Sequence, residues 1–139
     1  MALLLKRVGI PPHIKGYEFI KRAVLMVLED GTRIHYITKD LYPSIAQEYK
    51  TTASRTERAI RHAAEVSFDN MPPEMIEELF GNCVGFNKGK PTNSQFIATL
   101  VEAIKMNEED ESEENTNEKK NDDYVIKFVD SRSGRAGVQ

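Results

Sequence analysis

Three arginines recur on one face of the stretch Thr51–Phe68. On a helical wheel of 3.6 residues per turn, that face consists of Arg55, Arg58, Arg61, His62 and Glu65, with Glu57 at its edge. Guanidinium groups donate in a planar fork that matches guanine edges and phosphates, and a carboxylate can accept from the amino group of cytosine. The face therefore indicates contact with a nucleic acid. A solvated surface with Glu57–Arg61 and Arg61–Glu65 ion pairs is the alternative.

A single helix is expected to position these side chains. Thr51 or Thr52 can cap it, and Ser54-x-x-Glu57 fits a capping box. The side opposite the arginines is small and mostly apolar, so another helix can approach closely. It consists of Thr56, Ala59, Ile60, Ala63 and Val66.

The residues just upstream favour the nucleic-acid interpretation. Tyr42–Tyr49 has a proline at its start, which suits the first position of a helix, and carries apolar residues at helical spacing. A turn is expected at Lys50–Ala53. A short helix, a tight turn and an arginine-faced second helix together predict a helix-turn-helix.

Residues 41–66, LYPSIAQEYKTTASRTERAIRHAAEV, closely resemble the DNA-binding effector domain of the stage-zero sporulation response regulators of endospore-forming bacteria. PHIKGYEFIKRAV before this stretch and KPTNSQFIA after it are similar to the same family, so the resemblance runs from about Gly9 to about Lys105. It implies an all-helical domain whose second helix-turn-helix element reads a short DNA box in the major groove. It also implies base contacts from Arg55, Glu57 and Arg58.

Contacts with DNA phosphates are expected beside the groove. Lys88 and Lys90 lie in the loop to which the resemblance points, although a solvated loop is the alternative, and His62 is equally consistent with a plain surface residue. The expected phosphate contacts are Thr52, Ser54, Arg61, His62, Lys88 and Lys90. The partners that the resemblance implies are double-stranded DNA, RNA polymerase and a second copy arranged head to tail on tandem sites.

The sequence departs from the family pattern at several places. Only about eight residues precede Gly9, so we expect a stand-alone chain without the phosphoacceptor receiver domain. Lys50 occupies the turn position where the family usually has Asn, which would cost roughly 1 kcal/mol relative to Gly if that residue is left-handed. Thr56 replaces a buried aliphatic residue, which predicts softer helix packing. Asp69–Glu77 differs most strongly, in the neighbourhood where the family contacts RNA polymerase.

Composition divides the chain into a mildly basic body and an acidic tail. Residues 1–106 carry 14 Lys and Arg against 12 Asp and Glu, whereas residues 107–139 carry 5 against 10. We therefore expect a helix-turn-helix domain over 1–106, folded as an all-α, compact bundle of about six helices. Beyond it, 107–139 is expected to be a largely disordered acidic tail, because Asn107–Asp123 has no apolar residue. Only 124–129 is apolar there.

Periodicity and breakers place the other helices. They are expected at Ala2–Val8, His13–Glu29, Ile34–Leu41 stopped by Pro43, Pro73–Phe80 closed by a left-handed Gly81, and Asn93–Met106.

Other functional classes find little support. Gly85–Thr92 has the wrong glycine spacing for a phosphate loop, the three histidines make no metal spacing, and Cys83 is alone. No signal peptide, membrane span or catalytic set is apparent, so we expect a cytoplasmic protein that is not an enzyme and has no cofactor. The alternative function is a protein-interaction or antagonist module, in which a degenerate helix-turn-helix body presents the tail to a partner.

Overall fold

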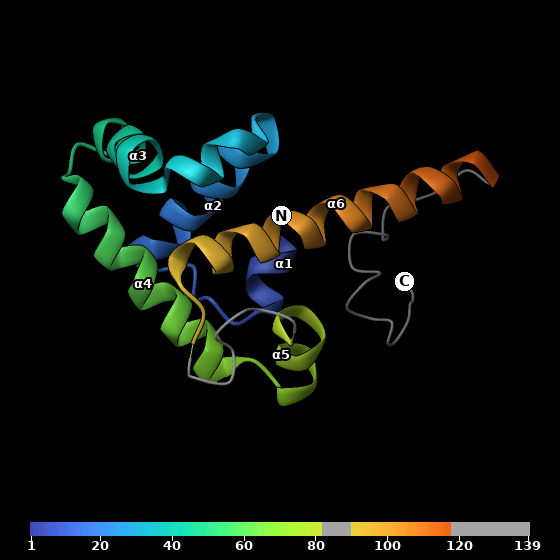
Figure 1. Cartoon of the computed structure of the whole chain (residues 1–139). Coiled ribbons are helices and arrows are strands. Elements are labelled where there is room, and N and C mark those ends of the chain that lie inside the picture. Colours follow the sequence, from blue (N-terminus) through green and yellow to red (C-terminus); the bar gives the residue numbers. More distant parts are fainter. Residues whose placement is uncertain (82–89, 118–139) are drawn as a thin grey trace.

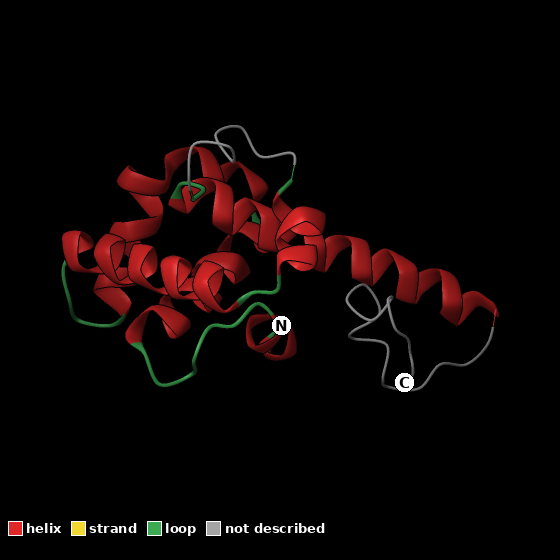
Figure 2. Ribbon diagram, turned by 90° about the horizontal axis from the view of Figure 1, so that it is seen from below, coloured by secondary structure: helices red, strands yellow, loops and turns green. Residues whose placement is uncertain are grey.

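The computed structural model describes residues 1–81 and 90–117, with side chains up to residue 107. Helices pack around one apolar core, and no strand occurs in this part of the chain (Figures 1 and 2). The predicted all-α fold class is thus confirmed. The elements are α1 (Ala2–Arg7), α2 (Lys15–Glu29), η1 (Gly31–Tyr36), η2 (Ile37–Leu41), α3 (Tyr42–Glu48), α4 (Ala53–Asn70), α5 (Pro73–Phe80) and α6 (Asn93–Asn117).

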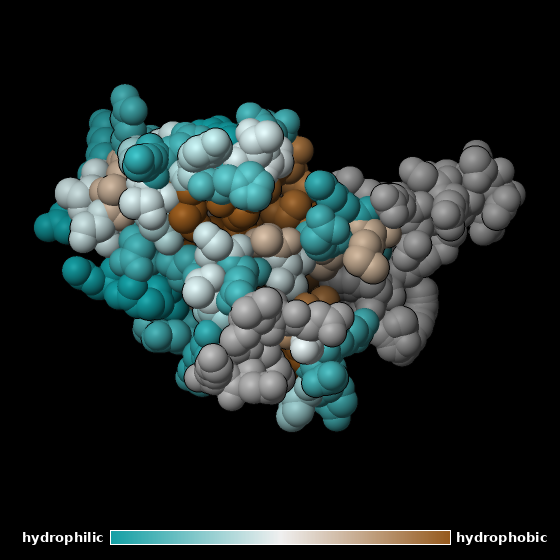
Figure 3. Space-filling model, viewed as in Figure 1, coloured by the Kyte–Doolittle hydropathy of each residue, from teal (hydrophilic) through white to brown (hydrophobic). Residues whose placement is uncertain are grey.

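Helix α2 lies at the centre of the bundle, against α3, α4 and α6. Its inward face buries Ile20, Ala23 and Val24 completely, and the facing helices contribute equally buried apolar side chains. At the other end of the core the Phe80 ring stacks on Phe96, with centroids 5.6 Å apart. In Figure 3 apolar side chains gather between the α2–α3 region and α6, whereas the edge formed by α4 is hydrophilic. Helix α4 therefore presents a polar face outward from a well-packed base.

Helices α2 and α4 approach each other at Gly16. A Cβ atom added to Gly16 would lie 2.6 Å from the Cβ of Ala63, and closer still to the carbonyl oxygen of Ala59. The small side of α4 faces α2 and makes this approach possible. Thr56, Ile60 and Ala63 are buried on that side, as predicted. The contact fixes where α4 lies relative to the start of α2.

The segment between α2 and α3 differs from the prediction of one α-helix stopped by Pro43. It forms the 3-10 turns of η1 and the π turn of η2, and it continues into α3 without a break. Pro43 does not end the helical segment. It lies in the first turn of α3, where backbone N–H groups have no partner within the helix, so the N–H that proline lacks is not missed. Arg33 donates from Nε and Nη2 to Asp40, at 2.7 and 2.8 Å, and these bonds hold the pKa of Asp40 below its usual range.

Two further boundaries are corrected. Pro73–Phe80 is helical as predicted, but Gly81 has φ −59° and is not left-handed. Helix α6 begins at Asn93 as predicted but continues to Asn117, past the expected end at Met106 (Figure 2). Extending a helix that packing has already nucleated costs little, and Glu is a good helix former. Helix α6 therefore extends beyond the expected domain boundary at residue 106.

Some predictions lie outside the described residues. They concern Cys83, Lys88 and residues 118–139, including the apolar segment 124–129.

Within the described ranges, none of the helices combines the length and the apolar character that crossing a membrane requires.

Candidate nucleic-acid interface

The turn between α3 and α4 has a defined hydrogen-bond pattern. The N–H of Thr51 donates to the carbonyl of Ala46 at 2.8 Å, and the N–H of Lys50 donates to that of Gln47 at 3.3 Å. These two bonds make a Schellman motif, whose penultimate residue must be left-handed. Lys50 fills that position with φ 56°. The predicted helix-turn-helix is therefore present, and its turn carries a lysine where glycine or asparagine would fit with less strain.

Replacing Lys50 by glycine should raise the free energy of unfolding by about 0.5–1 kcal/mol. Removing the strain of a left-handed lysine lowers the free energy of the folded state. This gain is larger than the free-energy cost of the extra conformational entropy that glycine loses on folding. Urea denaturation of the wild type and the variant measures the difference. Gln47→Gly, exposed in the last turn of α3, is the matched control and should lose up to about 1 kcal/mol. Equal destabilisation by both substitutions would contradict the assigned role of the turn.

Thr52 starts helix α4. Its Oγ1 accepts from the N–H of Arg55 at 3.1 Å, and its carbonyl accepts from the hydroxyl of Thr56 at 3.0 Å. Of the two predicted caps, Thr52 is thus the one used. The capping box from Ser54 to Glu57 is wrong, because the helix begins at Ala53 and Ser54 is already inside its first turn. The buried hydroxyl of Thr56 has a partner, so threonine fits where an aliphatic residue was expected.

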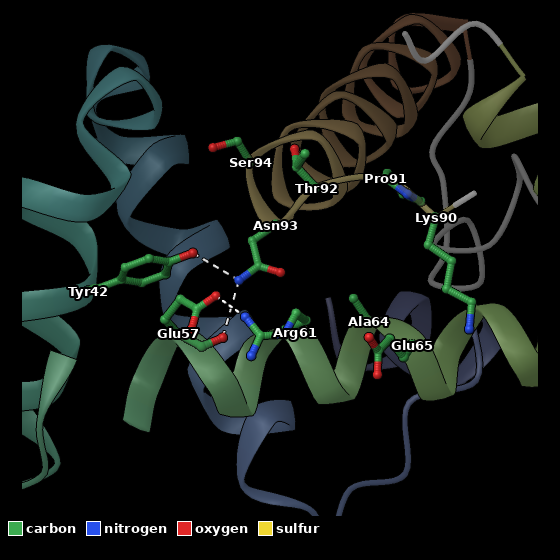
Figure 4. Close-up of a pocket in the computed structure, with 10 residues that line it drawn as sticks. All are labelled: Tyr42, Glu57, Arg61, Ala64, Glu65, Lys90, Pro91, Thr92, Asn93 and Ser94. Carbon is green, nitrogen blue, oxygen red and sulfur yellow. Dashed lines mark hydrogen bonds and ion pairs between the residues drawn. The ribbon is translucent and has the colours of Figure 1, made fainter. Parts of the chain in front are cut away.

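The exposed face of α4 has two flanks. The flank toward α2 borders a hollow lined by Lys15, Phe19, Thr51, Arg55, Arg58, Ala59 and His62. The flank toward α6 borders a second hollow, whose lining includes Glu57, Arg61 and Glu65 from α4 and residues 90–94 (Figure 4). The base-contact and phosphate-contact residues predicted on α4 are thus divided between its two sides, and Lys90 joins them from the segment before α6. Ser54 is exposed near its start.

Charges on the α6 flank are compensated within the protein. The guanidinium of Arg61 pairs with the carboxylate of Glu57, as the solvated-surface interpretation predicts for this i,i+4 pair. Lys90 Nζ lies 3.2 Å from Asp69 Oδ1. Two cations that were expected to contact phosphates therefore already have anionic partners in the protein.

Asn93 joins three helices at this flank. Its side-chain amide donates to the hydroxyl of Tyr42 at 2.8 Å and to the backbone carbonyl of Glu57 at 3.2 Å (Figure 4). Burial raises the pKa of Tyr42, so its hydroxyl remains protonated at neutral pH. Sequence reasoning missed this link between α3, α4 and α6, because Tyr42 and Asn93 are 51 positions apart and neither residue type is distinctive.

A capping box holds Asn93 in place. Gln95 N–H donates to Thr92 Oγ1 at 3.1 Å, and Thr92 N–H donates to Gln95 Oε1 at 2.9 Å. The spacing Thr92-x-x-Gln95 is the signal that could have located this helix start from the sequence.

Comparison with known families shows to which family the chain belongs. Residues 1–104 match the family described as "Sporulation initiation factor Spo0A C terminal". The chain belongs to this family. The Spo0A C-terminal family consists of DNA-binding domains of sporulation transcription regulators and is not a family of enzymes, so DNA is the partner class of this domain. The match begins at residue 1 and includes α1, whereas the sequence resemblance begins at about Gly9.

In this member of the Spo0A C-terminal family, the segment after α1 anchors the far end of α4. The hydroxyl of Ser67, fully buried, donates to the carbonyl of Val8 at 2.6 Å, and the amide of Asn70 donates to the carbonyl of Gly9 at 3.0 Å. Gly9 has φ +85°, and a Cβ there would meet that of Asn70 at 2.6 Å. Helix α4 of this Spo0A C-terminal domain is thus held at its cap, along α2 and at its end.

Proposed function

We propose that the chain binds a short duplex DNA box sequence-specifically, with α4 in the major groove and Arg55 and Arg58 each contacting a guanine. One observation supports this most directly. Both arginines are exposed in the N-terminal half of α4, and neither forms an ion pair with any described residue. A guanidinium without an anionic partner can donate both forked N–H groups to guanine O6 and N7.

Glu57 is the proposed contact to a cytosine. Its carboxylate accepts from Arg61, and a carboxylate has lone pairs enough to accept from a second donor. Arg61 can therefore orient Glu57 while its remaining N–H groups face a phosphate. The further proposed phosphate contacts are Thr52, Ser54, His62, Lys88 and Lys90. Contact with RNA polymerase and head-to-tail pairing on tandem boxes stay predictions from the family.

Glu57→Gln should weaken discrimination at one base position by about 1–3 kcal/mol, because the amide presents donors as well as an acceptor to the base. The measurement is the affinity for the box and for boxes substituted at each position in turn. Glu65→Gln, two turns further along α4 and exposed, is the control and should leave every position unchanged. Unchanged discrimination in Glu57→Gln would remove Glu57 from the base contacts.

Selection of bound sequences from random duplexes tests the proposed function as a whole. The expected result is one enriched short box that binds more tightly than a scrambled duplex over a range of salt concentrations. Equal, salt-dependent binding to both duplexes would overturn sequence-specific recognition and would favour the protein-interaction module instead.

A further inference from the structure

The α2 flank of α4 gathers positive charge that the protein does not compensate. Lys15 from α2 lies around one hollow with three α4 residues, Arg55, Arg58 and His62. All four side chains are exposed, and none forms an ion pair with another residue in the described part of the chain. Sequence reasoning assigned no role to Lys15, because it is 40 positions before Arg55 and outside the helix-turn-helix.

The two flanks of the recognition helix therefore differ in charge. On the α6 flank Arg61 pairs with Glu57, Lys90 pairs with Asp69, and Glu65 adds a further anion. On the α2 flank three permanent cations and a histidine face solvent with no carboxylate among the residues that line the hollow. Cations that repel one another in the isolated protein gain most when a polyanion replaces their counterions.

The packing of Gly16 fixes the backbone of Lys15 beside the recognition helix. Gly16 is buried against the backbone of α4 at Ala59, and a Cβ atom added there would collide with that backbone. The first turn of α2 consequently cannot move away from α4 without opening that contact. A lysine on a packed helix is a more defined contact point than one on a loop.

We propose that Lys15 contacts a DNA phosphate, on the strand that borders the α2 flank when α4 lies in the major groove. This inference rests on the proposed function and extends it to a residue outside the helix-turn-helix. The major groove is about 12 Å wide and a helix with its side chains nearly fills it, so an element packed beside that helix meets the sugar-phosphate backbone. Lys15 supplies affinity there and no base preference.

The test compares salt dependence of binding in the wild type, Lys15→Ala and Lys15→Arg, with the selected box and a scrambled duplex. Lys15→Ala should weaken binding to both duplexes by the same factor and reduce the slope of log affinity against log salt by about 0.9. Between 50 and 200 mM salt its affinity should consequently fall about 3.5-fold less than that of the wild type. Lys15→Arg should behave as the wild type does.

Lys21→Ala is the matched control, since Lys21 lies on the same helix with its Nζ over the Tyr17 ring, 5.8 Å from the centroid. It should leave the slope unchanged. Lys15→Gln, which keeps most of the aliphatic stem, replaces the alanine variant if the latter unfolds at a lower temperature. An unchanged slope in a folded Lys15 variant would overturn the inference, as would weakening confined to the box. A reduced slope in a protein without any box preference would refute the proposed function and leave the phosphate contact standing.

Discussion

Gly16→Ala should lower the free energy of unfolding by about 1–3 kcal/mol, the usual cost of overpacking a close contact. The added methyl group would meet the Cβ of Ala63 at 2.6 Å and the carbonyl oxygen of Ala59 closer still. Neither atom belongs to a side chain that can rotate away, so α2 and α4 must separate. Urea or thermal denaturation measures the loss. Gly16→Val should cost more, because its branches add to the same collision.

The control for this prediction is Gly31→Ala. Gly31 is exposed in η1, and no atom lies within 4 Å of where its Cβ would be. That substitution should change the free energy of unfolding by no more than about 0.5 kcal/mol. If both alanine variants were equally stable, α2 and α4 would not be in the close contact described above. DNA affinity should fall only in the Gly16 variants, since separation of the helices displaces both Lys15 and α4.

Local patterns in the sequence predicted the parts of this domain that depend on neighbouring residues. The apolar spacing of α2 and the small side of α4 are visible within one helix, as is the cap at Thr52. The Glu57–Arg61 pair was predicted as an alternative for the same reason. Each of these features is set by residues a few positions apart. The unusual turn position of Lys50 was visible only from the resemblance to the family.

Features that depend on distant residues were not predictable. The ion pair of Lys90 with Asp69 joins residues 21 positions apart, and the bond from Asn93 to Tyr42 joins residues still further apart. The need for glycine at position 16 comes from its contact with Ala59 and Ala63 of α4, which the residues around Gly16 do not reveal. The 3-10 and π turns of η1 and η2 also escaped prediction, because tertiary packing and the Arg33–Asp40 pair hold a path that apolar periodicity does not encode.

Arg58→Ala should reduce discrimination between the box and a singly substituted box by about 1–3 kcal/mol, or roughly 5- to 150-fold. Arg58 is exposed on the α2 flank and has no anionic partner among the described residues, so its fork can reach a base edge. Affinities for the box, for each substituted box and for a scrambled duplex measure the effect. The loss should fall at one base position.

Arg58→Lys keeps the positive charge of the side chain but removes the paired guanidinium donors. It should keep most of the nonspecific affinity and lose the discrimination, because an ammonium group cannot donate bidentately to guanine in the geometry of a guanidinium. Wild-type binding of all duplexes by Arg58→Ala would show that this arginine reads no base. Retained discrimination in Arg58→Lys would show that Arg58 acts through its charge alone.

The bonds from Ser67 to Val8 and from Asn70 to Gly9 set an order of assembly. They span 59 and 61 positions, so Val8 and Gly9 are synthesised well before their partners on α4. Contacts between such distant residues are the last to repay the entropy of closing the intervening loop. The segment after α1 can therefore be anchored to α4 only once α4 has been made.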